Sequence, residues 1–99
     1  MTQQSAYLVL SDLTLSAVQA EATRAYLLHG DHSMLGVAVT ESDRLAILAE
    51  EVGEVAKELN EDRLGNLDPY DWRDRRVKEL IQVAAMALSW VEALEGRRP

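Results

Sequence analysis

Apolar side chains recur every three or four positions between residues 45 and 59, in the segment LAILAEEVGEVAKEL. This spacing gathers them on one face of a helix, about 100° wide. The apolar face consists of Leu45, Leu48, Ala49, Val52, Val55, Ala56 and Leu59. Glu51, Glu54 and Glu58 form a second, acidic line along the same helix. We therefore expect one face to lie in the core. We also expect a neighbour to cover the acidic side, where Ile47 lies among the carboxylates.

A helix is expected before this one, over residues 8–28. Either Ser11 or Asp12 can serve as its N-cap, because short polar side chains accept hydrogen bonds from the first free backbone amides. Gly30 is well placed to end the helix, since glycine adopts a positive φ without steric cost. The segment 34–39 contains glycine and β-branched residues, which predicts a loop or a short extended piece.

The central helix is expected to begin after Thr40, whose side chain can cap it, and to end near Asn60 or Glu61. A third helix is expected to begin at Pro69, with Asp68 as its N-cap, because the first helical turn does not need the N–H that proline lacks. It should end at Gly96. The chain is therefore predicted to be all-α, with the last two helices packed antiparallel.

The third helix is apolar on two sides. One side carries Val77, Leu80, Ile81, Ala84, Leu88 and Val91, and the other carries Val83, Met86, Trp90 and Leu94. A helix of this kind is usually buried on both sides. Three helices cannot cover both faces, so we expect a homodimer or homotetramer that completes a four-helix-bundle-like core.

Composition narrows the class of protein further. A chain of 99 residues supports one domain, expected to span residues 1–99 with flexible ends at 1–10 and 97–99. The formal net charge of −7 argues against a nucleic-acid partner, which needs clustered Lys and Arg. Cysteine is absent, which excludes disulfides and thiolate metal sites. The sequence shows no signal-peptide pattern and no apolar run that could span a bilayer, so we expect a soluble cytoplasmic protein with no membrane partner.

Two polar pairs stand out on the last two helices. Glu51 with Glu54, and Glu79 with Gln82, are each spaced i, i+3 on one helix face. Antiparallel packing would let the pairs face one another. Carboxylates about 6 Å apart repel by roughly 2–3 kcal/mol per pair at an effective dielectric constant of 20. A divalent cation removes this repulsion, and Mg²⁺ suits hard oxygen ligands.

The same residues carry a resemblance to a known family. The chain has the sequence EEVGE at residues 50–54, then 24 intervening residues, then ELIQ at residues 79–82. This arrangement resembles the E-E-x-x-E and E-x-x-D motifs of the MazG-like, all-α nucleoside triphosphate pyrophosphohydrolases. The likeness covers residues 18–94. It departs from the family pattern at Gln82, which stands where the family has aspartate.

The resemblance implies an activity and a metal site. A nucleoside or deoxynucleoside triphosphate would be cleaved between its α and β phosphates, giving the monophosphate and pyrophosphate, with Mg²⁺ or Mn²⁺ as cofactor. The implied ligands are Glu51, Glu54, Glu79 and Gln82. Because an amide is neutral, Gln82 predicts weaker metal binding than the family aspartate would give.

Further site residues are hypotheses from the surrounding sequence. Glu50 adjoins the ligand positions and can orient or deprotonate the attacking water. The candidates for phosphate contacts are Lys57, Arg75, Arg76 and Lys78. The basic residues near the start of the third helix can equally form a surface ion network with neighbouring acids.

Three alternatives remain open at this point. The protein can be a family member that binds nucleotide with little turnover, because of Gln82. It can instead be a small helical interaction module that dimerises through Met86, Trp90 and Leu94, with its glutamates providing solubility. His29 and His32 are interpreted as ordinary polar loop residues, with nucleotide contact as the alternative.

Overall fold

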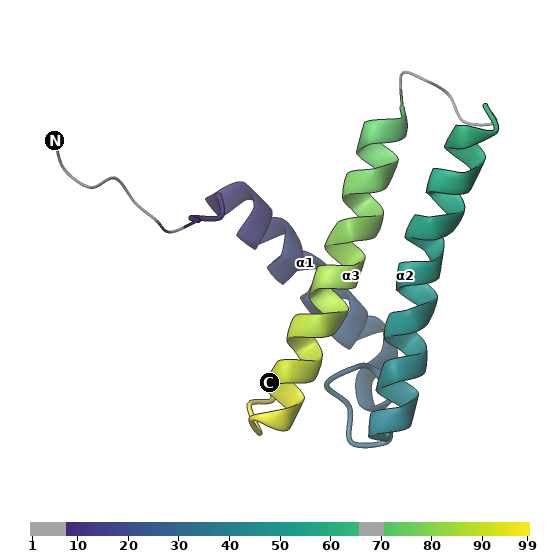
Figure 1. Ribbon diagram of the computed structural model, residues 1–99. Helices are drawn as coiled ribbons and strands as arrows, with labels where there is room; N and C mark the ends of the chain where they lie inside the picture. Colours follow the sequence, from purple (N-terminus) through teal and green to yellow (C-terminus); the bar gives the residue numbers. More distant parts are fainter. Residues whose placement is uncertain (1–7, 66–70) are drawn as a thin grey trace, which may run out of the picture.

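Three helices make up the fold in this computed structural model, which describes residues 8–65 and 71–99. They are α1 (Asp12–His29), α2 (Glu41–Arg63) and α3 (Trp72–Leu94), and a short 3-10 turn, η1 (Gly30–His32), follows α1. Helices α2 and α3 lie antiparallel as a hairpin, and α1 crosses α3 at an angle (Figure 1). The described residues contain no strand, so the all-α prediction is confirmed.

Two predicted N-caps that fall within the described residues are confirmed, although α1 begins at Asp12 and not at residue 8. Ser11 is the N-cap of α1, and its hydroxyl accepts a hydrogen bond from the Thr14 amide at 3.1 Å. Thr40 and Asp43 form a reciprocal capping box at the start of α2, with bonds of 3.1 and 2.9 Å. Each cap satisfies amides that would otherwise lack partners. Gly30 ends α1 with φ of +54°, the positive value expected there.

The other boundaries differ slightly from the predictions. Helix α2 continues to Arg63, beyond the expected end near Asn60 or Glu61. Helix α3 ends at Leu94, with Gly96 just beyond it at φ of +73°. Asp71 precedes α3, while the predicted Asp68 cap and Pro69 start lie outside the described residues. No helix within residues 8–65 and 71–99 has both the length and the apolar content that crossing a lipid bilayer requires.

The core is small and centres on α3. Its main cluster includes Ala25 from α1, Met34 from the loop after η1, and Ala85 and Met86 from α3, with Ile47 and Trp90 packed against it. Ala85 is fully buried. Small side chains at such positions let helix backbones approach closely. Ile47 is thus partly covered. The sequence predicted this, because a large aliphatic side chain among carboxylates is expected to have a neighbour over it.

Much of the apolar surface on the hairpin stays exposed in the single chain. We define the hairpin stripes as Leu45, Val52 and Leu59 on α2 and Val77, Leu80, Leu88 and Val91 on α3, each about half exposed. The expectation that the α2 apolar face lies in the core is therefore not met within one chain. The reason is geometric, because α2 packs against α3 but not against α1.

Candidate functional site

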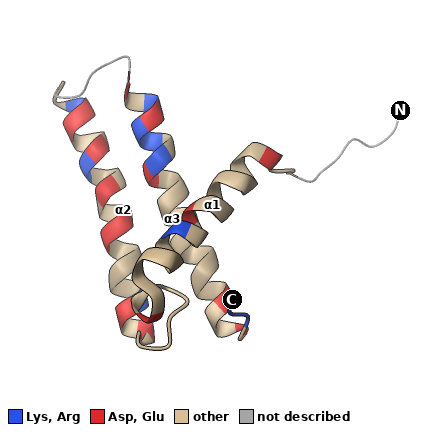
Figure 2. Cartoon of the chain, turned by 180° about the vertical axis from the view of Figure 1, so that it is seen from behind, with Lys and Arg blue, Asp and Glu red and all other residues tan. Residues whose placement is uncertain are grey.

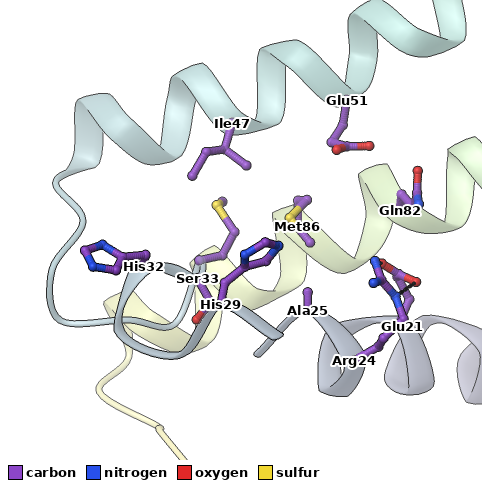
Figure 3. Close-up of a pocket in the computed structure, with 11 residues that line it drawn as sticks. Glu21, Arg24, Ala25, His29, His32, Ser33, Ile47, Glu51, Gln82 and Met86 are labelled. Carbon is purple, nitrogen blue, oxygen red and sulfur yellow. Dashed lines mark hydrogen bonds and ion pairs between the residues drawn. The ribbon is translucent and has the colours of Figure 1, made fainter. Parts of the chain in front are cut away.

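A pocket of about 220 Å³ lies where α1, α2 and α3 meet (Figure 3). Its polar end is formed by Glu21 and Arg24 from α1, Glu51 from α2 and Gln82 from α3. Its other end is lined mainly by Ala25, His29, His32, Ser33, Met34, Ile47 and Met86. The pocket thus joins a carboxylate cluster to a mainly apolar hollow.

The side chain of Gln82 bridges two of the predicted ligands. One atom of its amide lies 3.2 Å from Glu51 Oε2 and 3.0 Å from Glu79 Oε2. With nitrogen in that position, the amide donates a hydrogen bond to each carboxylate. With oxygen there, three oxygen atoms converge, an arrangement that repels unless a cation lies among them. With its nitrogen toward the carboxylates, the Gln82 amide satisfies their hydrogen-bonding capacity without a metal. With its oxygen toward them, the three residues present three oxygen ligands to a cation.

The electrostatic environment of Glu51 is unfavourable to its charge. Burial raises the pKa of this carboxyl above its ordinary value, and Glu79, Glu50, Glu54 and Glu21 raise the same pKa further. A raised pKa in the folded protein means that the ionised group lowers stability at neutral pH. This contribution disappears once the pH falls low enough to protonate Glu51 in both the folded and unfolded chain. The group is therefore held charged at a cost that a bound cation would offset.

Glu21 is a fourth carboxylate that the sequence did not single out. Its side chain is 15% exposed, and Arg24 binds it through Nε–Oε1 and Nη2–Oε2 contacts of 3.0 and 2.6 Å. The hydrogen bonds from Arg24 lower the pKa of Glu21, and Lys78 contributes in the same direction. In the sequence this pair looks like any i, i+3 ion pair on a helix surface. Only the crossing of α1 over α3 brings it to the pocket.

Two of the predicted site glutamates lie apart from this pocket. Glu54 is exposed and lines a separate hollow with Lys57, Glu58, Glu61 and Arg75. Glu50 is also exposed. Within the described residues, no group of three or more His, Asp or Glu side chains is arranged to hold a metal ion. The structure therefore brings together Glu51, Glu79 and Gln82, and it leaves Glu50 and Glu54 beside them.

The basic candidates are distributed mostly away from the pocket. Acidic residues follow α2, and basic residues gather at the start of α3 (Figure 2). Arg75 contacts Glu58 at 3.7 Å as well as Asp71, and Arg76 contacts Asp62 at 3.5 Å. Arg76 also stacks on the Trp72 ring at 5.0 Å. Arg75 and Arg76 thus take part in the surface ion network that was the alternative interpretation of this region.

A buried arginine holds the loop that forms the pocket wall. Arg44 donates from Nε to the Met34 carbonyl at 2.8 Å and from Nη2 to the Gly36 carbonyl at 3.0 Å. It also pairs with Glu41 at 3.1 Å, and Glu41 accepts a hydrogen bond from Trp90 Nε1 at 2.9 Å. These contacts tie the loop to α2 and α3, so they fix the position of Met34 in the pocket.

Replacing Gln82 with aspartate is expected to tighten Mg²⁺ binding about tenfold, because ligand charge strongly sets the affinity of oxygen sites for divalent cations. The measurement is calorimetric titration with MgCl₂. Gln19→Asp on the exposed surface of α1 is the matched control, since it adds the same charge away from the pocket. Equal Mg²⁺ affinity in Gln82→Asp and wild type would show that the side chain at position 82 does not face the cation.

Comparisons of the chain with family models, curated proteins and solved structures find no match. The function is therefore argued from the arrangement of Glu51, Glu79 and Gln82 beside the pocket.

Proposed function

We propose that the protein is a Mg²⁺-dependent nucleoside triphosphate pyrophosphohydrolase, which converts an NTP or dNTP and water into the monophosphate and pyrophosphate. The observation that carries this proposal is the convergence of Glu51 and Glu79 on Gln82, whose amide atom lies 3.2 Å from Glu51 Oε2 and 3.0 Å from Glu79 Oε2 beside a pocket. These residues come from two different helices, so the cluster depends on the fold. These three are among the four ligands that the motif resemblance implies, the fourth being Glu54.

The donor set fits a hard divalent cation. Glu51 and Glu79 provide carboxylate oxygens, and Gln82 can turn its amide oxygen toward them. When bound, Mg²⁺ would neutralise phosphate charge and make a coordinated water more acidic. Glu54, which the resemblance also implies as a ligand, lines a separate hollow and is therefore not included in this donor set. Glu50 is proposed to accept the proton of the water that attacks the phosphoanhydride, as the bond between the α and β phosphates breaks.

The shape of the pocket supports a nucleotide with its phosphates at the acidic end. A volume of about 220 Å³ is smaller than typical pockets that enclose a whole ligand, so it suits one part of a nucleotide. The end lined by Ile47 and Met86 is mainly apolar and can contact the face of a base. His29 and His32 lie at this end, where a nucleotide contact by either would be made.

The hairpin stripes support assembly into a homodimer or homotetramer. Seven large aliphatic side chains stay about half exposed on two neighbouring helices. Large apolar surface left exposed on this scale is typical of interfaces when it forms one patch. Two hairpins packed through their stripes would form a four-helix core. Sedimentation equilibrium should give a multiple of the 11.0 kDa chain mass, and a monomer at micromolar concentration would contradict this part of the proposal.

The activity is tested by measuring pyrophosphate release from a panel of ribo- and deoxyribonucleoside triphosphates. The reactions contain Mg²⁺ or Mn²⁺, and a chelator serves as the control. Metal-dependent release is expected for at least one substrate. No release across the panel, from protein shown to be folded by circular dichroism, would reject the hydrolase.

A second candidate function is nucleotide binding with little turnover. It is favoured by the Gln82 amide, which can donate to both carboxylates and so satisfy them without metal. Calorimetry with nucleotide and metal would then show binding in the absence of pyrophosphate release.

The interaction-module alternative is less well supported. Met86 is only 8% exposed and Trp90 packs against the core, whereas Leu94 is 67% exposed, so only one of the three residues assigned to this dimer surface is largely exposed in the single chain. In such a module Trp90→Ala would abolish partner binding while Glu79→Gln would have no effect. In the hydrolase, Glu79→Gln should remove pyrophosphate release.

A further inference from the structure

The acidic end of the pocket poses a charge problem for a nucleotide. Glu21 and Glu51 line it, and Glu79 adjoins it through Gln82. A triphosphate is itself strongly anionic, and a single divalent cation does not balance both the ligand and the protein carboxylates. Among the described residues that line the pocket, Arg24 is the only Lys or Arg. It is therefore the one permanent positive charge that the pocket wall offers to a phosphate.

The Arg24 guanidinium is oriented but not saturated. Its Nε and Nη2 donate to the two oxygens of Glu21, and a guanidinium has five N–H groups in all. The remaining N–H groups donate to no other side chain or carbonyl among the described residues. The Arg24 side chain is 55% exposed, whereas that of Glu21 is 15% exposed. Glu21 thus holds one edge of the guanidinium, and the other edge stays accessible to a ligand.

The other basic candidates are placed less favourably. Arg75 and Arg76 contact acids near the start of α3, and Lys57 lines a separate hollow with Glu54. Lys78 lies within electrostatic range of Glu21 but does not line the pocket. Arg24, in contrast, points toward the same space as Glu51 and Gln82 (Figure 3).

We propose that Arg24 is the residue that binds a phosphate of the nucleotide in this pocket, with Glu21 as its positioning residue. The free edge of the guanidinium donates to phosphate oxygens, for which its planar geometry is well suited. The inference rests on the proposed function, because it assumes that the ligand is a nucleotide. It assigns the phosphate contact to α1, a helix that contributes none of the motif residues.

The test compares Arg24→Gln, Arg24→Lys and the control Arg63→Gln, which removes an exposed arginine at the far end of α2. Arg24→Gln is expected to raise KM for the triphosphate about tenfold, with a smaller change in kcat, and Arg24→Lys should recover part of the loss. Calorimetry with inorganic pyrophosphate in MgCl₂ should show about tenfold weaker binding to Arg24→Gln. Binding of Mg²⁺ alone should be no weaker than in wild type. Glu21→Gln should raise KM by a smaller factor, since it leaves the arginine present but less well oriented.

The outcomes separate this inference from the proposed activity. If the wild type releases pyrophosphate and Arg24→Gln has an unchanged KM, the Arg24 assignment is wrong and the hydrolase stands. If the wild type binds pyrophosphate without turnover and Arg24→Gln loses that binding, the assignment stands and the hydrolase is rejected. A wild type that neither turns over nucleotides nor binds pyrophosphate would overturn both.

Discussion

Replacing Glu51 with glutamine is expected to reduce metal-dependent pyrophosphate release at least about 100-fold while making the metal-free protein more stable at neutral pH. The loss of activity would follow from removing one of the two carboxylates that are proposed to bind the cation with Gln82. The gain in stability follows from the raised pKa of Glu51, which reflects burial and repulsion by Glu79 and the neighbouring acids. A functional residue that opposes folding is the usual sign of a stability–activity conflict.

The direction of the pKa shift determines how the stability gain of Glu51→Gln depends on pH. The folded-state pKa of Glu51 lies above the unfolded value, so the charged form is favoured in the unfolded chain and stability is lost as the pH rises through the folded pKa. Glu51→Gln removes this loss. Its advantage should therefore be present at pH 7 and should vanish at a pH low enough to protonate Glu51 in wild type.

Urea denaturation followed by circular dichroism, at neutral and acidic pH, measures the stability effect, and the pyrophosphate assay measures the activity. Glu95→Gln is the matched control, because it removes the same charge from an exposed position just after α3, outside the pocket, and should keep full activity. Undiminished release by Glu51→Gln would reject the site. A Glu51→Gln protein that is less stable than wild type at pH 7 would instead mean that its charge is well compensated in the fold.

Replacing Arg44 with methionine should lower the free energy of unfolding by about 2–4 kcal/mol. Arg44 is 6% exposed, and its guanidinium donates to the carbonyls of Met34 and Gly36. Methionine keeps much of the apolar stem but leaves both carbonyls without these donors. A buried polar group without a partner costs about 1–3 kcal/mol. Glu41 also loses its ion pair, though it keeps the hydrogen bond from Trp90.

The measurement is urea denaturation monitored by tryptophan fluorescence, which also reports the surroundings of Trp90. Arg63→Met is the control, because within residues 8–65 and 71–99 Arg63 bonds only to exposed Asn60, and its loss should change stability by no more than about 0.5 kcal/mol. Equal stability of Arg44→Met and Arg63→Met would show that the loop does not depend on the buried guanidinium. In the hydrolase, the freed loop should also raise KM, because Met34 lines the pocket.

Local signals were sufficient for the helices and their caps. The spacing of apolar residues predicted the central helix, and Ser11, Thr40 and Gly30 occupy the boundary positions expected of them. Caps and glycines act through backbone groups only a few residues away, so the sequence contains the whole interaction. The sequence also allowed us to predict that Glu51 faces Glu79 and Gln82, because this needs only two antiparallel helices joined by a short connection.

The residues that were missed depend on long-range packing. Arg44 has the appearance of an ordinary charged residue in a first helical turn, yet the loop folds over it and buries it. Glu21 and Arg24 look like a surface ion pair until α1 crosses α3. Glu54 shares the motif and the helix face with Glu51 but lines a different hollow, because it lies about 4.5 Å further along α2 and about 60° around it.

The sequence by itself determined the all-α class, the N-caps of α1 and α2, and which polar pairs on the last two helices could meet. These properties follow from periodicity and capping, which are local. Only the tertiary structure decided that α1 adds Glu21 and Arg24 to the pocket, that Arg44 anchors the loop, and that the hairpin stripes stay uncovered in one chain. Those outcomes depend on the angle at which helices cross and on which faces find a neighbour, and no short stretch of sequence encodes either.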